Sequence, residues 1–291
     1  MVEDACPLRL IHRGVELLIG WAGVAPLHAQ VSARFDLATS NRYVWHGLSR
    51  AAGVVLQPSL AVGYRLRGFT LSSGLARHYE LDRVSPDELS ELGNSNGHLG
   101  EDDLWLQADL AVGSVRLRSG LARYVFRGAS PQSGGGALGN TTETYLALGA
   151  VTAYLNPQLE AWWDVDRVRG GFLRASANSP VFGWPIEPFF FVSLAGEIGL
   201  NLGQQPDPAR PGDLANFSRR GLTHAGLGLD LLYRASQRPG VGSANLNLGL
   251  NAQLNLDDAT RYNGAGRKKN TILWLSAGVT LLLGGEARTV R

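Results

Sequence analysis

The chain has 291 residues, a formal net charge of +2, 44% hydrophobic residues and only 18% charged residues. Basic and acidic residues are nearly balanced, so the chain lacks the excess of basic residues that is typical of nucleic-acid-binding proteins. We therefore expect no nucleic-acid partner. Its 37 glycines argue against a mainly helical fold, because Gly is unfavourable inside helices. No run reaches the eighteen or so apolar residues of a membrane helix, so a membrane-spanning form of this chain would have to be a β-barrel.

Residues 1–29 have the pattern of a secretory signal. Two arginines precede the apolar run LLIGWAGVA, and the small residue Ala29 offers a cleavage site. An amphipathic helix is the alternative, since Glu16 interrupts the pattern. We expect a signal peptide over 1–29 and one domain over 30–291. Removal of the signal would remove Cys6, the only cysteine, and with it any disulfide or thiol chemistry.

The first predicted strand covers 31–46 and ends in the stretch RYVWHGLS. Apolar and polar residues alternate along it, as they do in a strand with two different faces. Tyr43 and Trp45 lie near its end, and amphipathic rings of this kind favour the membrane–water interface. We therefore predict that both are interface aromatics at the outer edge of a membrane barrel, the alternative being aromatics that pack a soluble core.

A period of two recurs along the rest of the chain. It is clearest over 244–256, where leucines occupy one face while Asn247, Asn251 and other polar residues occupy the opposite face. A strand separates such sets, whereas a helix would spread both around its circumference. Twelve segments show the pattern: 31–46, 54–66, 69–78, 102–113, 115–126, 141–154, 159–167, 171–178, 188–201, 219–234, 244–256 and 270–283.

The links between these segments alternate in length. Gly68, 113–114 and 155–158 are tight turns, whereas long polar stretches such as 79–101 lie between them. Short turns at one end and long loops at the other are typical of outer-membrane barrels. The predicted fold class is all-β, a single antiparallel up-and-down transmembrane β-barrel of about twelve strands. Two links, after 178 and after 234, are longer than this plan requires and leave the strand count open by two.

The start of the first strand resembles a known family. FDLATSNRYVWHGLSRAAGVVLQPSLAVGY is similar to the opening of the outer-membrane porin family labelled TorF, with its Gcw-type conserved hypothetical members. The matching positions are Asp36, Ser40, Tyr43, Trp45, Gly47, Ser49 and Gln57, whereas His46 stands where the family has Arg. The resemblance covers about thirty residues. It implies an outer-membrane β-barrel and supplies no catalytic residues.

Partners follow from this assignment. Outer-membrane lipid would surround the barrel, and the basic run 267–270 in a predicted outer loop is a candidate for pairing with lipopolysaccharide. The last segment partly matches the signal read by the barrel-assembly machinery, through Ser276, Gly278 and Leu281, but Leu283 replaces the usual aromatic. A homo-oligomer is possible, as for many porins, but no interface is visible in the sequence.

Charged and amide residues on the non-leucine faces are the predicted lumen and selectivity residues. Glu160, Asp164 and Asp166 share a parity on one segment and are predicted to face arginines across the lumen, which would create a transverse field. The full predicted set is Arg65, Arg67, Asp109, Arg116, Arg118, Glu160, Asp164, Asp166, Asp230, Asn247 and Asn251.

Chemistry beyond permeation has little support in the sequence. The histidines outside the signal, His46, His78, His98 and His224, show no metal-ligand spacing, so we expect no metal and no cofactor. Glycine-rich runs lack the Lys-Ser/Thr of a phosphate loop. An outer-membrane lipid hydrolase would need a lipid-facing Ser near a His, and none is apparent, so we expect no enzyme.

The predicted function is passive diffusion of small hydrophilic solutes or ions through an outer-membrane, porin-like channel. One alternative is a closed structural or adhesion barrel that acts through its outer loops, with the long loop 79–101 as a plug or a binding surface. Less favoured alternatives are an outer-membrane lipid hydrolase and a soluble secreted sandwich.

Overall fold

The computed structural model describes residues 30–66, 68–81, 99–126, 140–152, 154–184, 189–210, 213–238, 242–262 and 268–284. The predicted signal 1–29, Arg67, His98 and most of the loop 79–101 lie outside the described residues.

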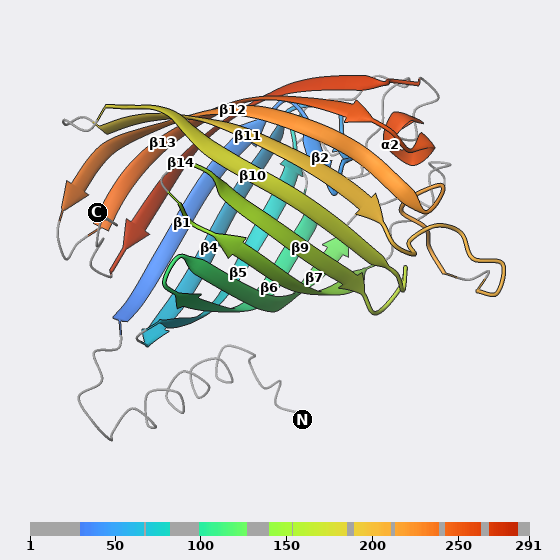
Figure 1. Cartoon of the computed structure of the whole chain (residues 1–291), viewed down its shortest axis with the longest axis horizontal. Coiled ribbons are helices and arrows are strands. Elements are labelled where there is room, and N and C mark those ends of the chain that lie inside the picture. The colour runs from blue at the N-terminus through green and yellow to red at the C-terminus, as the bar shows by residue number, and fades with distance from the viewer. Residues whose placement is uncertain are drawn as a thin grey trace, which may run out of the picture.

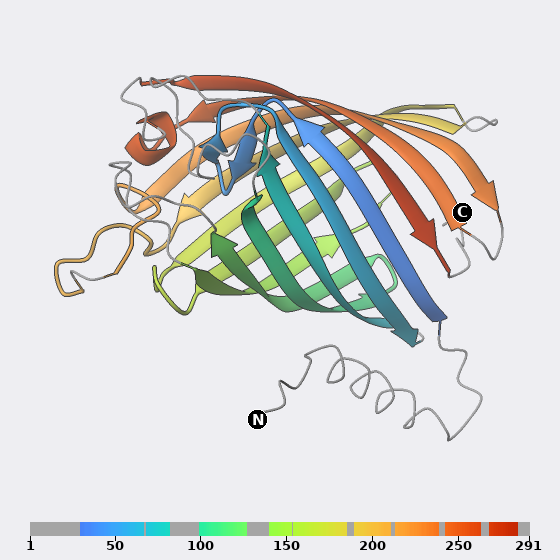
Figure 2. The same cartoon turned by 180° about the vertical axis from the view of Figure 1, so that it is seen from behind.

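The described residues form a closed antiparallel barrel of twelve strands, which confirms the predicted fold class (Figures 1 and 2). Each strand pairs with its neighbours along the chain, and β1 pairs with β14 from Ala33 opposite Leu283 to Ser40 opposite Ser276, which closes the sheet. The barrel strands are β1 (Gln30–Ser40), β4 (Val55–Leu66), β5 (Phe69–Glu80), β6 (Leu99–Val112), β7 (Val115–Phe126), β8 (Thr141–Ala150), β9 (Asn156–Asp164), β10 (Gly171–Trp184), β11 (Phe189–Asn201), β12 (Gly221–Arg238), β13 (Gly242–Asn255) and β14 (Thr271–Leu283).

Leucine side chains form the outer surface of this barrel. On β13, Leu248 is 54% exposed, whereas Gln253 and Asn255 of the opposite parity are 1% exposed. The same contrast recurs around the barrel and inverts the pattern of a soluble sandwich, which buries its leucines. A surface of contiguous apolar side chains on paired strands suits contact with lipid.

β10 and β12 continue past the ends that their sequence pattern indicates. β10 continues to Trp184 through a register shift between Pro180 and Phe182, and β12 continues to Arg238 through a shift between Arg234 and Ser236. These irregularities break the strict alternation that marks a strand in sequence. The two links that looked too long are therefore mostly strand, and the count stays at twelve.

The segment between β1 and β4 departs from the prediction of one strand over 31–46. β1 ends at Ser40, and a separate hairpin follows, with β2 (Tyr43–Trp45) paired to β3 (Leu48–Ala51). His46 and Gly47 form its two-residue turn with φ of 48° and 81°. Positive φ at both central residues is what tight hairpin turns require, and Gly accepts it without strain.

This inner hairpin, residues 41–54, lies inside the barrel at the end that carries the long links (Figure 2). The Tyr43 ring stacks on His78 of β5, and the Trp45 ring meets Tyr124 of β7 edge-on. On the opposite side, Gln253 of β13 donates a 2.7 Å hydrogen bond to the carbonyl of Gly47. Contacts to strands on both sides of the barrel show that the hairpin crosses the lumen.

A buried apolar layer accompanies the hairpin. Leu48 packs with Phe172 of β10 and Phe217 of the β11–β12 link, and these two rings are stacked 5.6 Å apart. Phe172 and Phe217 are almost fully buried. The lumen at the end with the long links, called its outer part below, is thus filled by packed side chains.

The prediction that Tyr43 and Trp45 are interface aromatics is wrong. Tyr43 is 7% exposed and donates a 3.0 Å hydrogen bond to Glu101, and Trp45 lies against the guanidinium of Arg50. The chain bends at Asn41 and Arg42, directly after β1, and β2 carries the two rings into the lumen. Sequence alternation alone does not distinguish a strand that continues outward from one that turns inward.

Helical structure in the described part is limited to short segments such as α2 (Asp258–Tyr262) in the β13–β14 link (Figure 1). None of the helices described there is long and apolar enough to cross a membrane.

Gly47→Ala should destabilise the barrel more than Gly113→Ala. Both glycines have positive φ, but a Cβ at Gly47 would lie 2.1 Å from the ring of His224, whereas one at Gly113 meets nothing within 4 Å. Backbone strain of roughly 1 kcal/mol is common to both changes, and the clash adds about 1–3 kcal/mol at Gly47. Urea unfolding in detergent measures the free energy of unfolding of both variants. Equal decreases in this free energy would contradict the contact between the hairpin turn and His224.

Candidate functional site

The candidate site is the barrel lumen below the inner hairpin. Alternate residues of each strand point into it, opposite in parity to the exposed leucines. Of the predicted lumen residues, this parity applies to Arg65, Asp109, Arg116, Arg118, Glu160, Asp164, Asp230, Asn247 and Asn251. Arg67 lies outside the described residues.

Charges in the lumen are paired along the wall. Arg118 of β7 donates a 2.9 Å hydrogen bond to Asp109 of β6, its register partner. Arg174 of β10 donates a 2.6 Å hydrogen bond to Glu160 of β9, also its register partner. Arg174 also lies 3.8 Å from Glu197 of β11.

These pairs correct the predicted transverse field. Glu160 pairs with Arg174 on the adjacent strand and not with an arginine of β4 or β7. Arg174 was not among the predicted lumen residues, although the register of two neighbouring strands places it opposite Glu160. Local pairing offsets Glu160 and Asp109, whereas Asp230 of β12 forms no ion pair with any described residue.

Asp164 holds a turn and does not line the open lumen, contrary to the prediction. Its Oδ1 accepts backbone N–H groups of Asp166, Val168 and Arg169 at 3.0–3.1 Å, and its Oδ2 accepts the hydroxyl of Thr141. The residue is fully buried. A carboxylate with several donors satisfies the backbone of the β9–β10 link, which would otherwise lack partners.

Asp166 lies beyond the end of β9 and is also outside the lumen. Its carboxylate pairs with Arg123, which shares the parity of the lipid-facing residues on β7. Because β9 ends at Asp164, the period of two that grouped Asp166 with Glu160 does not extend to it.

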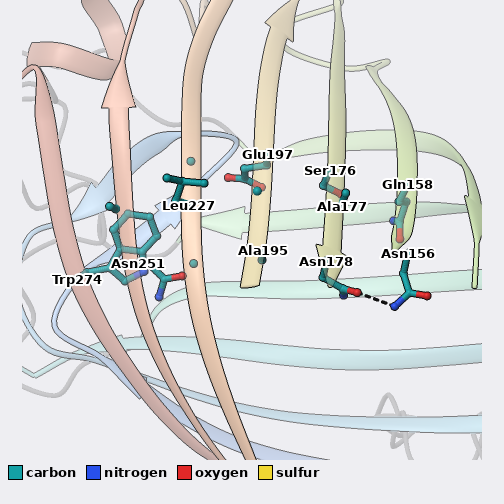
Figure 3. A pocket seen from close by; sticks show the side chains of 14 residues that line it. Asn156, Gln158, Ser176, Ala177, Asn178, Ala195, Glu197, Leu227, Asn251 and Trp274 are labelled. Carbon is teal, nitrogen blue, oxygen red and sulfur yellow. Dashed lines mark hydrogen bonds between the residues drawn. The ribbon is translucent and has the colours of Figure 1, made fainter. Parts of the chain in front are cut away.

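A cavity of about 310 Å³ opens on one wall of the lumen (Figure 3). Asn156 of β9 and Asn178 of β10 face it and are joined by a 2.8 Å hydrogen bond. Glu197, Asn251 and Trp274 contribute side chains from β11, β13 and β14. Gly226 and Gly228 of β12 add no side chains, which widens the space. The wall offers amide and carboxylate groups that hydrogen-bond water or hydroxylated solutes.

The end of the lumen with short turns is basic. A second cavity of about 130 Å³ lies there against Arg116, Arg118 and Asp109. Asp109 pairs with Arg118, whereas Arg116 forms no ion pair with any described residue. The same holds for Arg65 of β4, and both arginines are exposed. This mouth therefore carries unpaired positive charge among the described residues.

Three buried histidine–carboxylate contacts lie at the opposite end, around the inner hairpin. They join His46 to Glu143, His78 to Asp103 and His224 to Glu197, each at 3.0–3.2 Å. Sequence spacing did not indicate them, because each pair joins different strands or the hairpin to a strand. Burial and the nearby Glu101 carboxylate raise the pKa of Tyr43 well above its usual value, so its hydroxyl stays protonated.

Comparison with models of known protein families and with curated proteins finds no match. Among solved structures, LpxR from Salmonella typhimurium is similar with 10% identity and a TM-score of 0.50, covering 85% of this chain and 99% of that chain. The NanC porin has 13% identity and a TM-score of 0.46, covering 85% and 98%. The COG4313 outer membrane channel from Pseudomonas putida F1 has 10% identity and a TM-score of 0.46, covering 89% and 97%. At these identities the likeness shows the fold alone.

Asp164→Ala should lower the free energy of unfolding by roughly 2–4 kcal/mol, because it leaves several buried donors without a charged acceptor. Asp166→Ala removes an ion pair whose side chains are both more than a third exposed, and should cost about 1 kcal/mol or less. Urea unfolding of both variants in detergent provides the comparison. A larger loss for Asp166→Ala would contradict the assignment of Asp164 as the residue that holds this turn.

Proposed function

We propose that the protein is a channel of the bacterial outer membrane for small hydrophilic solutes or ions. The observation that carries the proposal is the polar cavity inside a closed barrel with a leucine exterior. A side-chain-filled lumen would suffice for a structural barrel, whereas open space lined by Asn, Gln and charged groups suits permeation. The resemblance of the first strand to the TorF-type porin family supports the same proposal.

The inner hairpin is the proposed gate of this channel. It fills the outer part of the lumen, so passage past it requires the hairpin to move or the solute to pass beside it. This packing also favours the alternative of a closed barrel that acts through its outer loops. The two functions differ in whether removal of the hairpin yields a conducting pore.

Anions are the proposed preferred solutes. Arg65 and Arg116 place positive charge at the inner mouth, the end with the short turns, while Asp109 and Glu160 deeper in the lumen are paired with arginines. Rings of arginine favour anions in pores by the same electrostatics.

Replacement of residues 41–54 by an Asn-Gly turn should give a pore of larger unit conductance than the native protein. Ser40 and Val55 are register partners on β1 and β4, so a two-residue turn joins them without disturbing the barrel. Planar-bilayer recording gives the unit conductance, and heat-modifiable gel migration shows folding. Replacement of Gly113 and Ser114 by the same turn, at the other end of the barrel, is the control and should leave conductance unchanged.

The outcomes separate the two proposed functions. A folded variant without the hairpin that still shows no unit steps would reject the channel and leave the closed barrel. Steps of equal size with and without the hairpin would support a channel but reject the hairpin as its gate.

The double variant Arg65→Gln, Arg116→Gln should shift ion selectivity toward cations. The reversal potential in a KCl gradient, measured in the variant that lacks the hairpin, reports this shift. Arg77→Gln is the matched control, because Arg77 pairs with Asp102 and has the parity of the lipid-facing residues at the opposite end. An unchanged reversal potential in the double variant would contradict the proposed anion preference.

A further inference from the structure

We propose that His78, Glu101 and Asp103 form a binding site for a divalent first-row transition metal such as Zn²⁺. His78 lies on β5, and Glu101 and Asp103 lie on β6, at the end of the lumen that holds the inner hairpin. One ligand atom from each of the three lies within 4.8 Å of the others. Ligand atoms bound to one ion at about 2.0–2.2 Å each lie at most about 4.4 Å apart, so small side-chain movements suffice.

Two carboxylate oxygens at this site have no hydrogen-bond partner among the described residues. Oε2 of Glu101 and Oδ1 of Asp103 are both buried without one, and Glu101 is only 1% exposed. A buried carboxylate oxygen that lacks a donor is costly, because it has lost water and gained nothing in return. A cation between the two residues would satisfy both oxygens.

Charge balance favours a divalent cation. With both carboxylates ionised beside a neutral imidazole, the cluster would carry a charge of −2. Arg77 of β5 pairs with Asp102 instead, and Arg50 of β3, whose charge acts on Glu101, offsets it only in part. One nitrogen and two carboxylate ligands suit Zn²⁺ and related ions, whereas Ca²⁺ and Mg²⁺ prefer oxygen ligands alone.

The surroundings of His78 suit a metal ligand. Its Nε2 points to Asp103 at 3.0 Å, and its Nδ1 lies 2.8 Å from the side-chain amide of Gln57 on β4. A metal at Nε2 moves the ring proton to Nδ1, and a rotation of the Gln57 amide presents its oxygen to accept that proton. Such outer partners orient metal-binding imidazoles.

Metal binding would also fix the inner hairpin. The Tyr43 ring stacks on His78 at 4.5 Å, and its hydroxyl donates to Oε1 of Glu101, the oxygen that already has a partner. An ion that orders His78 and Glu101 therefore orders the surface on which Tyr43 rests. The site itself does not depend on whether the barrel conducts.

Titration of the EDTA-treated, detergent-purified protein with Zn²⁺ at neutral pH tests the proposal. We expect one equivalent to bind, with an affinity that falls roughly tenfold or more in His78→Gln and in Asp103→Asn. His224→Gln removes a buried imidazole that contacts a carboxylate at the same end of the barrel but belongs to no such triad, and should bind as the native protein does. Heat-modifiable migration verifies that each variant folds.

X-ray absorption of the Zn²⁺-loaded native protein provides a readout that needs no variant. One imidazole nitrogen with oxygen ligands is the expected set. Absence of stoichiometric binding would overturn the proposal and leave a proton shared between Glu101 and Asp103 as the alternative. A ligand set without imidazole, or undiminished binding in both folded variants, would overturn it as well.

Discussion

The hydrogen-bonded closure of β1 onto β14 is the constraint on which the rest of the structure depends. In lipid, a strand with unpaired backbone groups is not tolerated, so all twelve strands must belong to one closed sheet. Closure separates each strand into a leucine face toward lipid and a polar face toward the lumen. With twelve strands, the enclosed space is wider than the side chains of the wall alone can fill.

The inner hairpin uses that space. The chain bends after β1 and enters the barrel as β2, where Tyr43 and Trp45 contact aromatic and charged partners on several strands, and the turn at His46 and Gly47 leads it back as β3. The lumen is thereby divided along its axis into a packed layer at the end with long links and polar cavities below it. The proposed gate and the proposed metal site both lie at this layer and share the contact between Tyr43 and His78.

Local pattern predicted the wall of the barrel well. Alternation placed Asp109, Glu160, Asn247 and Asn251 on the polar face, and the lengths of the links predicted an up-and-down order of strands. The prediction was poorer for residues that lie just past the end of a strand, where the alternation of faces stops. Asp166 lies one turn past β9, and Tyr43 lies past the end of β1, so neither keeps the face that its parity suggested. Partners such as Arg174 for Glu160 depend on strand register, and the site at His78 depends on two strands and a hairpin meeting, which residue spacing does not encode.

The position of the inner hairpin inside the lumen is the central claim, and solution NMR of the protein in detergent micelles tests it most directly. Nuclear Overhauser contacts should connect the Tyr43 ring with His78 and the Trp45 ring with Tyr124, whose centroids lie 4.5 and 5.5 Å apart. Contacts of Tyr43 and Trp45 with the detergent chains, in place of these, would put the hairpin at the membrane interface and contradict the account.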